Sequence, residues 1–247
     1  NLNCGALYPE NMAKLVTKYN ADIGFSYDGD GDRVILADEK GNLVDGDYIM
    51  AIVSLHLMQK NLLPENTLVT TTMSNYGLRE AIENAGGRLI QTDVGDRNVT
   101  EALLKNDLIL GGEQSGHIIF LNHSTTGDAM IVCLEMLKVM QEANKKLSEL
   151  AQCMSKVPQV LINVRVKEKK PFEYIPQVQE RISHSESRLN GMGRLLVRYS
   201  GTEPVARIMV EGKDESLIQE IADSLAEQIK QEIGADEGIV PDRRTNK

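Results

Sequence analysis

Apolar and polar residues alternate along the chain with two spacings, one typical of helices and one typical of strands. Near the start, the helical spacing covers residues 9–19, and short apolar runs at residues 22–27 and 33–38 indicate two strands. An acidic loop separates these strands, and the turn Glu39-Lys40-Gly41-Asn42 closes a hairpin after the second. This opening block therefore has the pattern of part of an α/β unit.

From residue 45 onward, helical and strand-like segments follow one another in turn. Alternation at these lengths predicts a mostly parallel sheet with helices on its faces. Asp47 is placed to cap the first of these helices. The expected helices are residues 48–59, 78–85, 99–106 and 129–144, and the expected strands are residues 67–73, 88–94 and 108–110.

A third block follows with a different pattern. Residues 160–166, 193–199 and 205–210 alternate apolar and polar side chains, as half-buried strands do. Residues 216–233 form an amphipathic helix, and the combination predicts a small α+β domain. The polar tail, residues 234–247, is expected to be loose.

The composition narrows the classes of partner and compartment. The chain of 247 residues has a formal net charge of −9, whereas a nucleic acid or an anionic membrane surface would require a basic footprint. A local basic pocket for a small phosphate is compatible with that total. Cys4, Cys133 and Cys153 are scattered and lack CxxC spacing, which fits a reducing, cytoplasmic setting.

The two ends of the chain and its apolar runs give little sign of targeting. No apolar run approaches the ~20 residues of a membrane-spanning helix, and no secretory signal is visible. The first residue is Asn rather than Met, so we expect a fragment of a longer protein. The oligomeric state is not fixed by the sequence, and a homodimer stays open.

The most specific motif is the acidic loop Asp28-Gly29-Asp30-Gly31-Asp32-Arg33, which directly follows an apolar strand. At this spacing the glycines allow the backbone to curl until the three carboxylates face one point. Clustered carboxylates repel one another unless a cation lies among them. The loop therefore predicts a hard divalent ion, Mg²⁺ above all, bound by Asp28, Asp30 and Asp32.

Two other interpretations of the acidic loop stay open. One is a solvated acidic turn, although a plain turn needs no third aspartate. The other is an EF-hand calcium loop, because the three aspartates and Glu39 fall on its positions one, three, five and twelve. Position six of such a loop should be Gly but is Arg33, and a strand rather than a helix precedes it.

A second loop, Gly111-Gly112-Glu113-Gln114-Ser115-Gly116-His117, suits sugar hydroxyls. Its glycines let a ligand approach the backbone, Glu113 accepts hydrogen bonds, Ser115 donates or accepts them, and His117 adds an imidazole. The alternative is a tight turn with incidental polar groups. Ser115 is a weaker candidate for a nucleophile, because its base would have to be His117, only two residues away.

A third loop, Arg198-Tyr199-Ser200-Gly201-Thr202-Glu203-Pro204, lies between two expected strands, and Arg207 follows it. Small hydroxyl residues and Gly can turn backbone N–H groups toward an anion, and arginines add bidentate hydrogen bonds. An ordinary Ser-Gly hairpin is the alternative. The residues expected to bind phosphate are Arg198, Ser200, Gly201, Thr202 and Arg207.

A weaker candidate is the segment Val94-Gly95-Asp96-Arg97, which closes another strand–helix junction. The carboxyl ends of parallel strands tend to bind ligands, so Asp96 and Arg97 are candidates for substrate contact. A simple helix cap explains Asp96 equally well.

The three loops resemble those of the α-D-phosphohexomutases, and they occur in the same order along the chain. The acidic loop resembles that family's Mg²⁺ site, residues 111–117 resemble its sugar loop, and residues 198–204 resemble the loop for the phosphate that is not transferred. The form with Gln114 looks most like the phosphoglucosamine branch of the family. The resemblance extends from Asn1 to about Gly234.

The resemblance implies a fold and a domain plan. The fold class would be α/β, with mixed, mostly parallel three-layer domains followed by a smaller α+β domain. The family has four domains, so residues 1–44 would end the second, residues 45–157 would form the third and residues 158–247 the fourth. The family's Ser-His-Asn-Pro motif, which carries the phosphoserine, does not occur in these 247 residues, so the fragment would bind without turnover.

The implied reaction interconverts glucosamine 6-phosphate and glucosamine 1-phosphate through a phosphoserine and a 1,6-bisphosphate, and it feeds UDP-N-acetylglucosamine and bacterial wall synthesis. Arg33 would stabilise the phosphoryl group in transfer. The alternatives are a phosphomannomutase or phosphoglucomutase, and, from another class, a non-catalytic phosphosugar- or Ca²⁺-binding module. The residues that would contact the phosphorylated hexosamine are Glu113, Ser115, His117, Asp96 and Arg97.

Overall fold

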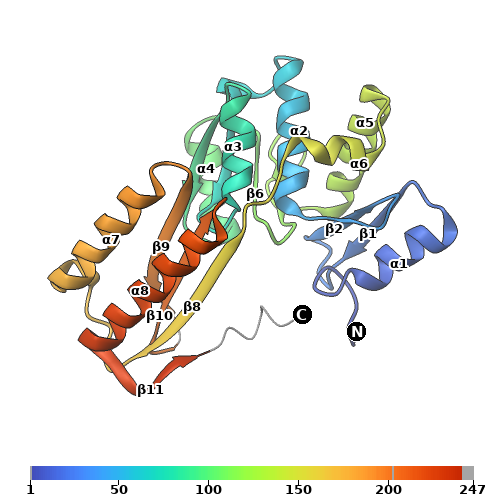
Figure 1. The fold of residues 1–247 in the computed structure, drawn as a ribbon. Helices are drawn as coiled ribbons and strands as arrows, with labels where there is room; N and C mark the ends of the chain where they lie inside the picture. The colour runs from blue at the N-terminus through green and yellow to red at the C-terminus, as the bar shows by residue number, and fades with distance from the viewer. Residues whose placement is uncertain (1, 202, 241–247) are drawn as a thin grey trace. The chain divides into compact units, whose positions relative to one another are not determined.

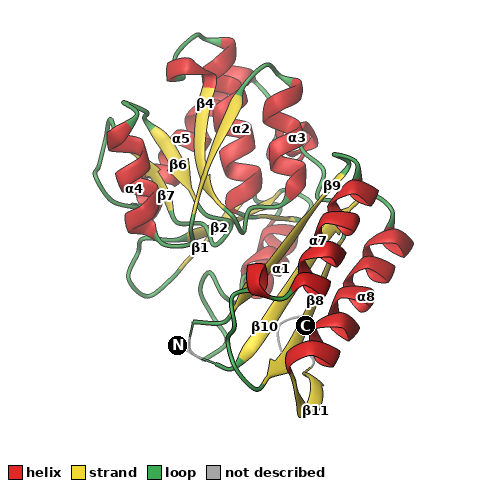
Figure 2. Ribbon diagram, turned by 90° about the vertical axis from the view of Figure 1, so that its left-hand side faces the viewer, coloured by secondary structure: helices red, strands yellow, loops and turns green. Residues whose placement is uncertain are grey.

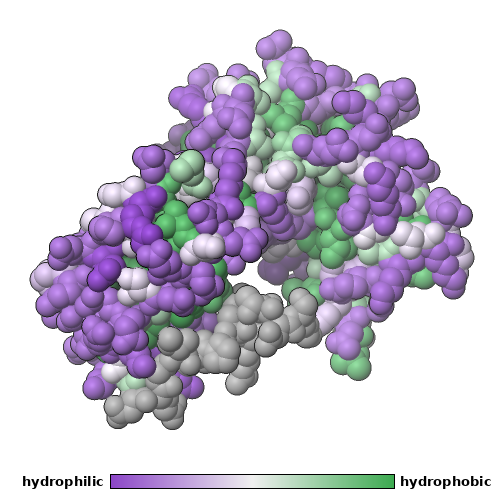
Figure 3. Space-filling view, viewed as in Figure 1, coloured by the Kyte–Doolittle hydropathy of each residue, from purple (hydrophilic) through white to green (hydrophobic). Residues whose placement is uncertain are grey.

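The computed structural model describes residues 2–201 and 203–240, which form two compact units (Figure 1). The first unit ends at Lys156 and the second begins at Val157, and each has its own hydrophobic core. Figure 3 shows hydrophilic side chains over most of the visible face of each unit. None of the helices in these described residues is both long and apolar enough to cross a membrane.

The first unit opens with a three-stranded antiparallel sheet. Its strands, in spatial order, are β1 (Ile23–Tyr27), β2 (Val34–Asp38) and β3 (Leu43–Val44). Helix α1 (Glu10–Tyr19) packs on this sheet, where Ala13 and Val16 cluster with Ala37. All five residues of β2 are buried, so this strand is covered on both faces. The acidic loop connects β1 to β2, which places it at one end of a rigid hairpin.

A second sheet makes up the rest of the first unit. Its strands are β4 (Thr67–Thr71), β5 (Arg88–Thr92), β6 (Leu110–Gly112) and β7 (Ile118–Phe120). The longer helices around it are α2 (Gly46–Gln59), α3 (Tyr76–Asn84), α4 (Asp96–Lys105) and α5 (Ala129–Ala143), and the short ones are η1 (Pro64–Asn66), α6 (Leu147–Leu150) and η2 (Ala151–Cys153).

Helices cover both faces of this second sheet (Figure 2). The strand order is β5-β4-β6-β7, with β4 parallel to β5 and β6, and β7 antiparallel to β6. Leu68 and Leu110 belong to the large core that includes α2, α3 and α5, whereas Val69 and Ile119 pack with Val99 of α4. Alternate residues of the strands therefore face different helices, and the result is a three-layer arrangement.

Helix α2 begins two residues before the start expected from the sequence. Its N-cap is Asp45, whose carboxylate accepts a hydrogen bond from the backbone N–H of Tyr48 at 3.4 Å. The prediction that Asp47 caps this helix is therefore wrong. Asp47 lies within the first turn, and its side chain is fully buried.

The second unit is an antiparallel sheet covered by helices. Its strands are β8 (Gln159–Val166), β9 (Gly193–Tyr199), β10 (Val205–Gly212) and β11 (Gly234–Val240), and its helices are η3 (Phe172–Tyr174), α7 (Pro176–Leu189) and α8 (Glu215–Ile233). The strand order is β11-β8-β10-β9, and α7 and α8 lie side by side over the sheet (Figure 2). Ile208 and Val210 of β10 pack with Ile221 and Leu225 of α8.

Two parts of this second unit differ from expectation. Helix α7 was not predicted, because it buries only Val178, Ser185 and Leu189, so its apolar stripe is too sparse to stand out. The first seven residues of the tail expected to be loose form β11, which pairs with β8, so that expectation is wrong for them. Residues 241–247 lie outside the described residues. The predicted fold class is confirmed.

Candidate functional site

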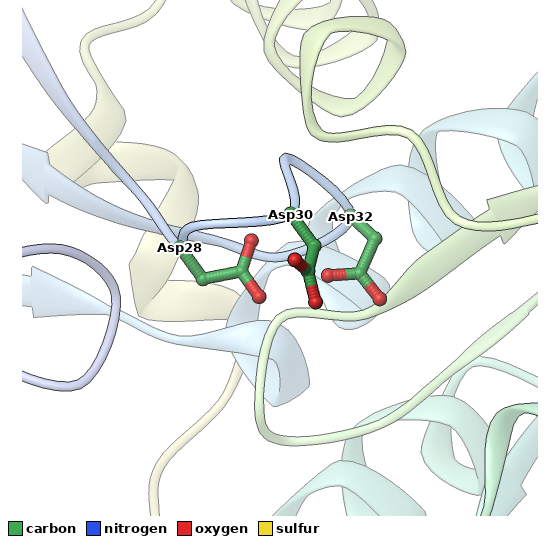
Figure 4. A group of neighbouring side chains, drawn as sticks. All are labelled: Asp28, Asp30 and Asp32. Carbon is green, nitrogen blue, oxygen red and sulfur yellow. The ribbon is translucent and has the colours of Figure 1, made fainter.

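The acidic loop brings its three carboxylates together. Asp28 Oδ1 accepts hydrogen bonds from the backbone N–H of Gly31 at 2.9 Å and of Arg33 at 3.3 Å, which curls the loop back on itself. One carboxylate oxygen from each of Asp28, Asp30 and Asp32 lies within 4.8 Å of the others. Figure 4 shows Asp28 and Asp32 pointing toward Asp30 from either side.

This cluster fits a divalent cation. Asp32 Oδ1 is buried and has no hydrogen-bond partner among the described residues, so one oxygen of the cluster has its coordination unmet. Burial works to raise the pKa of Asp28, but the backbone N–H groups of Arg33 and Gly31 and the charge of Arg33 help to outweigh it, so that the pKa is lowered. The loop thus favours the ionised form that a hard cation requires.

Arg33 lies at the edge of the acidic loop. Its guanidinium is 3.9 Å from Asp28 Oδ2, and its side chain is 45% exposed. The guanidinium therefore keeps donors available for an incoming anion, as the predicted role in stabilising a phosphoryl group requires.

His117, the last residue of the sugar loop, contacts the acidic loop. The Nδ1 atom lies 3.0 Å from Asp32 Oδ2, and the residue is only 2% exposed. A Cβ atom at Gly127 would lie 2.5 Å from the imidazole ring, so the ring fits only against a glycine there. The buried imidazole of His117 thus contacts the acidic loop and can orient the carboxylate of Asp32. Its direct contact with a sugar hydroxyl stays a prediction.

The sugar loop is the turn between β6 and β7. The backbone N–H of Glu113 donates to His117 O at 2.9 Å, and that of Gly116 donates to Glu113 O at 3.1 Å. Gly116 has φ +92°, and a Cβ there would meet Val34 O at 2.2 Å, so this position requires glycine. Val34 N–H in turn donates to Gly116 O at 3.2 Å, which joins the sugar loop to β2.

Glu113 joins the sugar loop to the turn before α4. One of its carboxylate oxygens accepts the backbone N–H of Gly95 at 2.9 Å, and the other accepts the Ser115 hydroxyl at 3.1 Å. Both oxygens keep a lone pair for further donors. Glu113 and Ser115 therefore lie together, as the sequence predicts for two residues that contact one sugar.

Asp96 and Arg97 are the first two residues of α4, and they follow Gly95, whose N–H donates to Glu113. Gly95 is the N-cap, and Asp96 accepts a hydrogen bond from the backbone N–H of Arg97 at 2.8 Å. The Arg97 guanidinium pairs with Glu101 at 2.7 Å on an exposed helix face. Their predicted contact with substrate stays a prediction.

Asp47 is a site residue that the sequence did not reveal. Its Oδ2 accepts the backbone N–H of Asn75 at 2.9 Å and the side-chain amide of Gln114 at 3.1 Å. Its Oδ1 is buried without a hydrogen-bond partner among the described residues. Burial, together with the nearby charge of Asp45, raises the pKa of Asp47 to about 7. The repeated acids of Asp45-Gly46-Asp47 are the signal that could have indicated it.

The phosphate loop of the second unit is the turn between β9 and β10. Arg198 and Arg207 are paired across these strands, so both start from the same end of the sheet. Ser200 is buried, its N–H donates to Val205 O at 2.8 Å, and its hydroxyl lies 3.4 Å from the Arg207 guanidinium. Thr202, also predicted to bind phosphate, lies outside the described residues.

Lys169 supports the phosphate loop, and the sequence did not reveal it. Its ammonium donates to Ser200 O at 2.6 Å and to Gly201 O at 3.4 Å. Because C=O and N–H point in opposite directions across a trans peptide, the N–H of Gly201 points away from Lys169. The loop can therefore present that N–H to an anion, in the manner of other backbone anion sites.

Comparison with known proteins identifies the family. The model for phosphoglucomutase/phosphomannomutase, alpha/beta/alpha domain III, matches residues 45–157, and the model for the C-terminal domain matches residues 161–228. The two matches cover most of the chain. The chain therefore belongs to the phosphoglucomutase/phosphomannomutase family, and the predicted resemblance to phosphohexomutases is confirmed.

Curated relatives narrow the comparison further. The phosphoglucosamine mutases of Geobacter sp. (strain M21) and Geotalea uraniireducens (strain Rf4) are 50% and 51% identical to this chain over 236 and 237 residues. Each alignment covers 96% of this chain and 52% of the relative. The chain thus spans about half the length of the curated relatives it matches.

Solved structures share the fold. The N-acetylphosphoglucosamine mutase of Aspergillus fumigatus in complex with GlcNAc-6P and magnesium has a TM-score of 0.72 at 22% identity, covering 93% of this chain and 57% of that one. A phosphoglucomutase/phosphomannomutase family protein of Burkholderia thailandensis has a TM-score of 0.72 at 18% identity, covering 92% and 50%.

Asp47→Asn should gain stability relative to the wild type as pH rises from about 4 to about 7. The pKa of Asp47 is about 7 in the folded chain and returns to 3.8 on unfolding. Between these values the folded state holds a proton that the unfolded state lacks, so wild-type stability falls as pH rises and levels off above the folded pKa. Urea unfolding of both proteins across this range measures the difference, and a difference independent of pH would contradict the prediction.

Proposed function

We propose that this chain is the part of a phosphoglucosamine mutase that holds the metal, the sugar and one phosphate. The whole enzyme would interconvert glucosamine 6-phosphate and glucosamine 1-phosphate in the cytoplasm, on the route to UDP-N-acetylglucosamine. The observation that carries the proposal is the convergence of Asp28, Asp30 and Asp32 beside a sugar loop joined to them through His117. The relatives that are about half identical to this chain support it.

The acidic loop would hold the metal of this enzyme. Asp28, Asp30 and Asp32 supply hard oxygen ligands of the kind that Mg²⁺ takes, and Asp32 Oδ1 has no competing partner among the described residues. When bound, Mg²⁺ neutralises charge that develops on a transferring phosphoryl group. Arg33 adds a fixed positive charge at the same edge of the loop.

The sugar loop and the phosphate loop would bind different chemical groups of the substrate. Glu113 and Ser115 accept or donate hydrogen bonds to sugar hydroxyls, with Glu113 held by Gly95. The second unit binds the phosphate that is not transferred, through arginine side chains and backbone N–H groups. Because this loop would bind the phosphate group rather than one face of the sugar, the same loop can hold a bisphosphate in either orientation. The residues of the loop proposed to bind phosphate are Arg198, Ser200, Gly201, Thr202 and Arg207.

A phosphomannomutase or phosphoglucomutase is the second candidate, because the matching family models carry both of those names. Gln114 favours the amino-sugar branch by resemblance. A non-catalytic phosphosugar- or Ca²⁺-binding module is the candidate from another class, and the experiments below separate all three.

Asp30→Asn is expected to weaken Mg²⁺ binding at least tenfold, because one of three anionic ligands becomes neutral. Asp30 is exposed, so the substitution tests the ion rather than the core. Calorimetric titration with MgCl₂ measures the affinity, with Asp22→Asn as the control at another exposed aspartate of the first unit. Equal Mg²⁺ affinity in the two variants would contradict a metal site in the acidic loop. Tight binding of Ca²⁺ without any phosphosugar affinity would favour the non-catalytic module.

Lys169→Met is expected to weaken binding of glucosamine 6-phosphate by roughly three- to tenfold, because two loop carbonyls lose a charged donor. The matched control is Lys170→Met, which removes the same charge next door but leaves intact the Lys170 carbonyl that accepts the Tyr199 hydroxyl. Titration of both variants with glucosamine 6-phosphate distinguishes the loss of the hydrogen bonds that hold the phosphate loop from the loss of one positive charge near it. Equal loss in both would refute a specific role for Lys169.

The purified 247-residue chain is expected to show no mutase turnover, because it contains no Ser-His-Asn-Pro segment to donate a phosphoryl group. A longer form that includes such a segment should convert glucosamine 6-phosphate with a higher kcat/KM than glucose or mannose 6-phosphate. A coupled assay on the three sugars tests both statements. Turnover by the chain alone would disprove the phosphoserine route, and equal kcat/KM values would favour the second candidate.

A further inference from the structure

The start of helix α2 lies directly against the sugar loop. The backbone N–H of Gly46 donates to Gln114 O at 3.1 Å. A Cβ atom at Gly46 would lie 2.0 Å from Glu113 O, so only a glycine permits this approach. The first turn of α2 is therefore in contact with the backbone that carries Glu113 and Ser115.

One carboxylate oxygen ties this helix to two loops. Asp47 Oδ2 accepts both the Asn75 N–H and the Gln114 side-chain amide. Asn75 is the N-cap of α3, where its own side chain accepts the N–H of Gly77 at 3.0 Å. The turn after β4 and the turn after β6 therefore share one acceptor at the carboxyl ends of neighbouring parallel strands.

The position of Asp47 is not explained by stability alone. A carboxyl that is fully buried loses hydration that hydrogen bonds with Asn75, Gln114 and Ser74 restore only in part, and its Oδ1 atom has no partner among the described residues. Replacing a buried carboxyl together with its donors by apolar groups of the same shape would usually be close to neutral for stability. What the carboxylate adds is direction, because it fixes where the Gln114 amide lies.

We propose that Asp47 is a positioning residue of the sugar loop, which it holds through Gln114 in register with the turn after β4. This inference rests on the proposed function of the loop. Gln114 is then a structural link rather than a sugar contact, since its amide points to Asp47. The hydrogen bond between Gln114 and Asp47 therefore positions Glu113 and Ser115, which lie on either side of Gln114.

Three substitutions test the link at different bonds. Gln114→Met keeps the length of the side chain and removes only the bond to Asp47. Asp47→Leu keeps the branched shape of the side chain and removes the bonds to both loops. Asp47→Asn keeps an oxygen that accepts from both donors, so it is the conservative variant that should restore the link.

Amide hydrogen exchange in the free 247-residue chain is the first measurement. Exchange at Glu113 and Gly116 should be roughly tenfold faster in Gln114→Met and in Asp47→Leu, and close to wild type in Asp47→Asn. The double variant Gln114→Met/Asp47→Leu should exchange no faster than Asp47→Leu, because both changes cut the same link. Additive effects, or unchanged exchange in Gln114→Met, would overturn the proposal.

Titration with glucosamine 6-phosphate is the second measurement. Affinity should fall roughly tenfold in the two disruptive variants and recover in Asp47→Asn. Asp45→Ala is the control, because it removes the α2 cap without touching Gln114. Equal loosening of the loop by Asp45→Ala would assign the effect to the helix and refute the link. If the wild-type chain binds no phosphosugar, the proposed function fails, while the exchange data still decide the role of Asp47.

Discussion

The contact between the sugar loop and the acidic loop is the constraint on which the first unit's site depends. His117 Nδ1 meets Asp32 Oδ2, and the backbones of the two loops are bridged beside it at Arg33. Three carboxylates placed this close repel one another, so the loop that carries them must be held from outside. The hairpin β1–β2 supplies one side of that restraint and the turn β6–β7 supplies the other. A displacement of either would therefore move both the three aspartates of the acidic loop and the polar side chains of the sugar loop.

The remaining polar contacts extend this restraint outward. Glu113 reaches the turn before α4 through Gly95, and Gln114 reaches the turn after β4 through Asp47. Successive residues of the sugar loop are thus tied to the turns that follow two parallel strands of one sheet, β5 and β4. In the second unit, Lys169 and Arg207 hold Ser200 from its carbonyl and its hydroxyl. In both units charged side chains fix short loops, so that the exposed atoms of these loops can meet a ligand without rearrangement, a form of preorganisation.

The sequence indicated the three loops of the proposed site, but it did not indicate the residues that hold those loops in place. The acidic, sugar and phosphate loops each combine unusual side chains with glycines at strand ends, and that is a local pattern. Asp47 and Lys169 were not predicted as site residues because their partners lie 28, 67 and 31 residues away, so only the folded chain brings them together. Asp47 was even interpreted as a helix cap, since an acid at a helix start usually is one. Helix α7 was missed for a related reason: its buried face includes Ser185, which no hydrophobic pattern marks.

The close packing at Gly46 and Gly116 limits how the backbone of the sugar loop can change. At Gly46 a single added carbon would meet the Glu113 carbonyl, and at Gly116 it would meet the Val34 carbonyl. Both obstacles are backbone atoms, which cannot move aside as a side chain can. Under the proposed function, redesign for another hexose is therefore confined to exchanging the side chains at positions 113 and 115 on an unaltered main chain. Insertions or deletions in this turn would displace His117 from Asp32 and so break the contact between the sugar loop and the acidic loop.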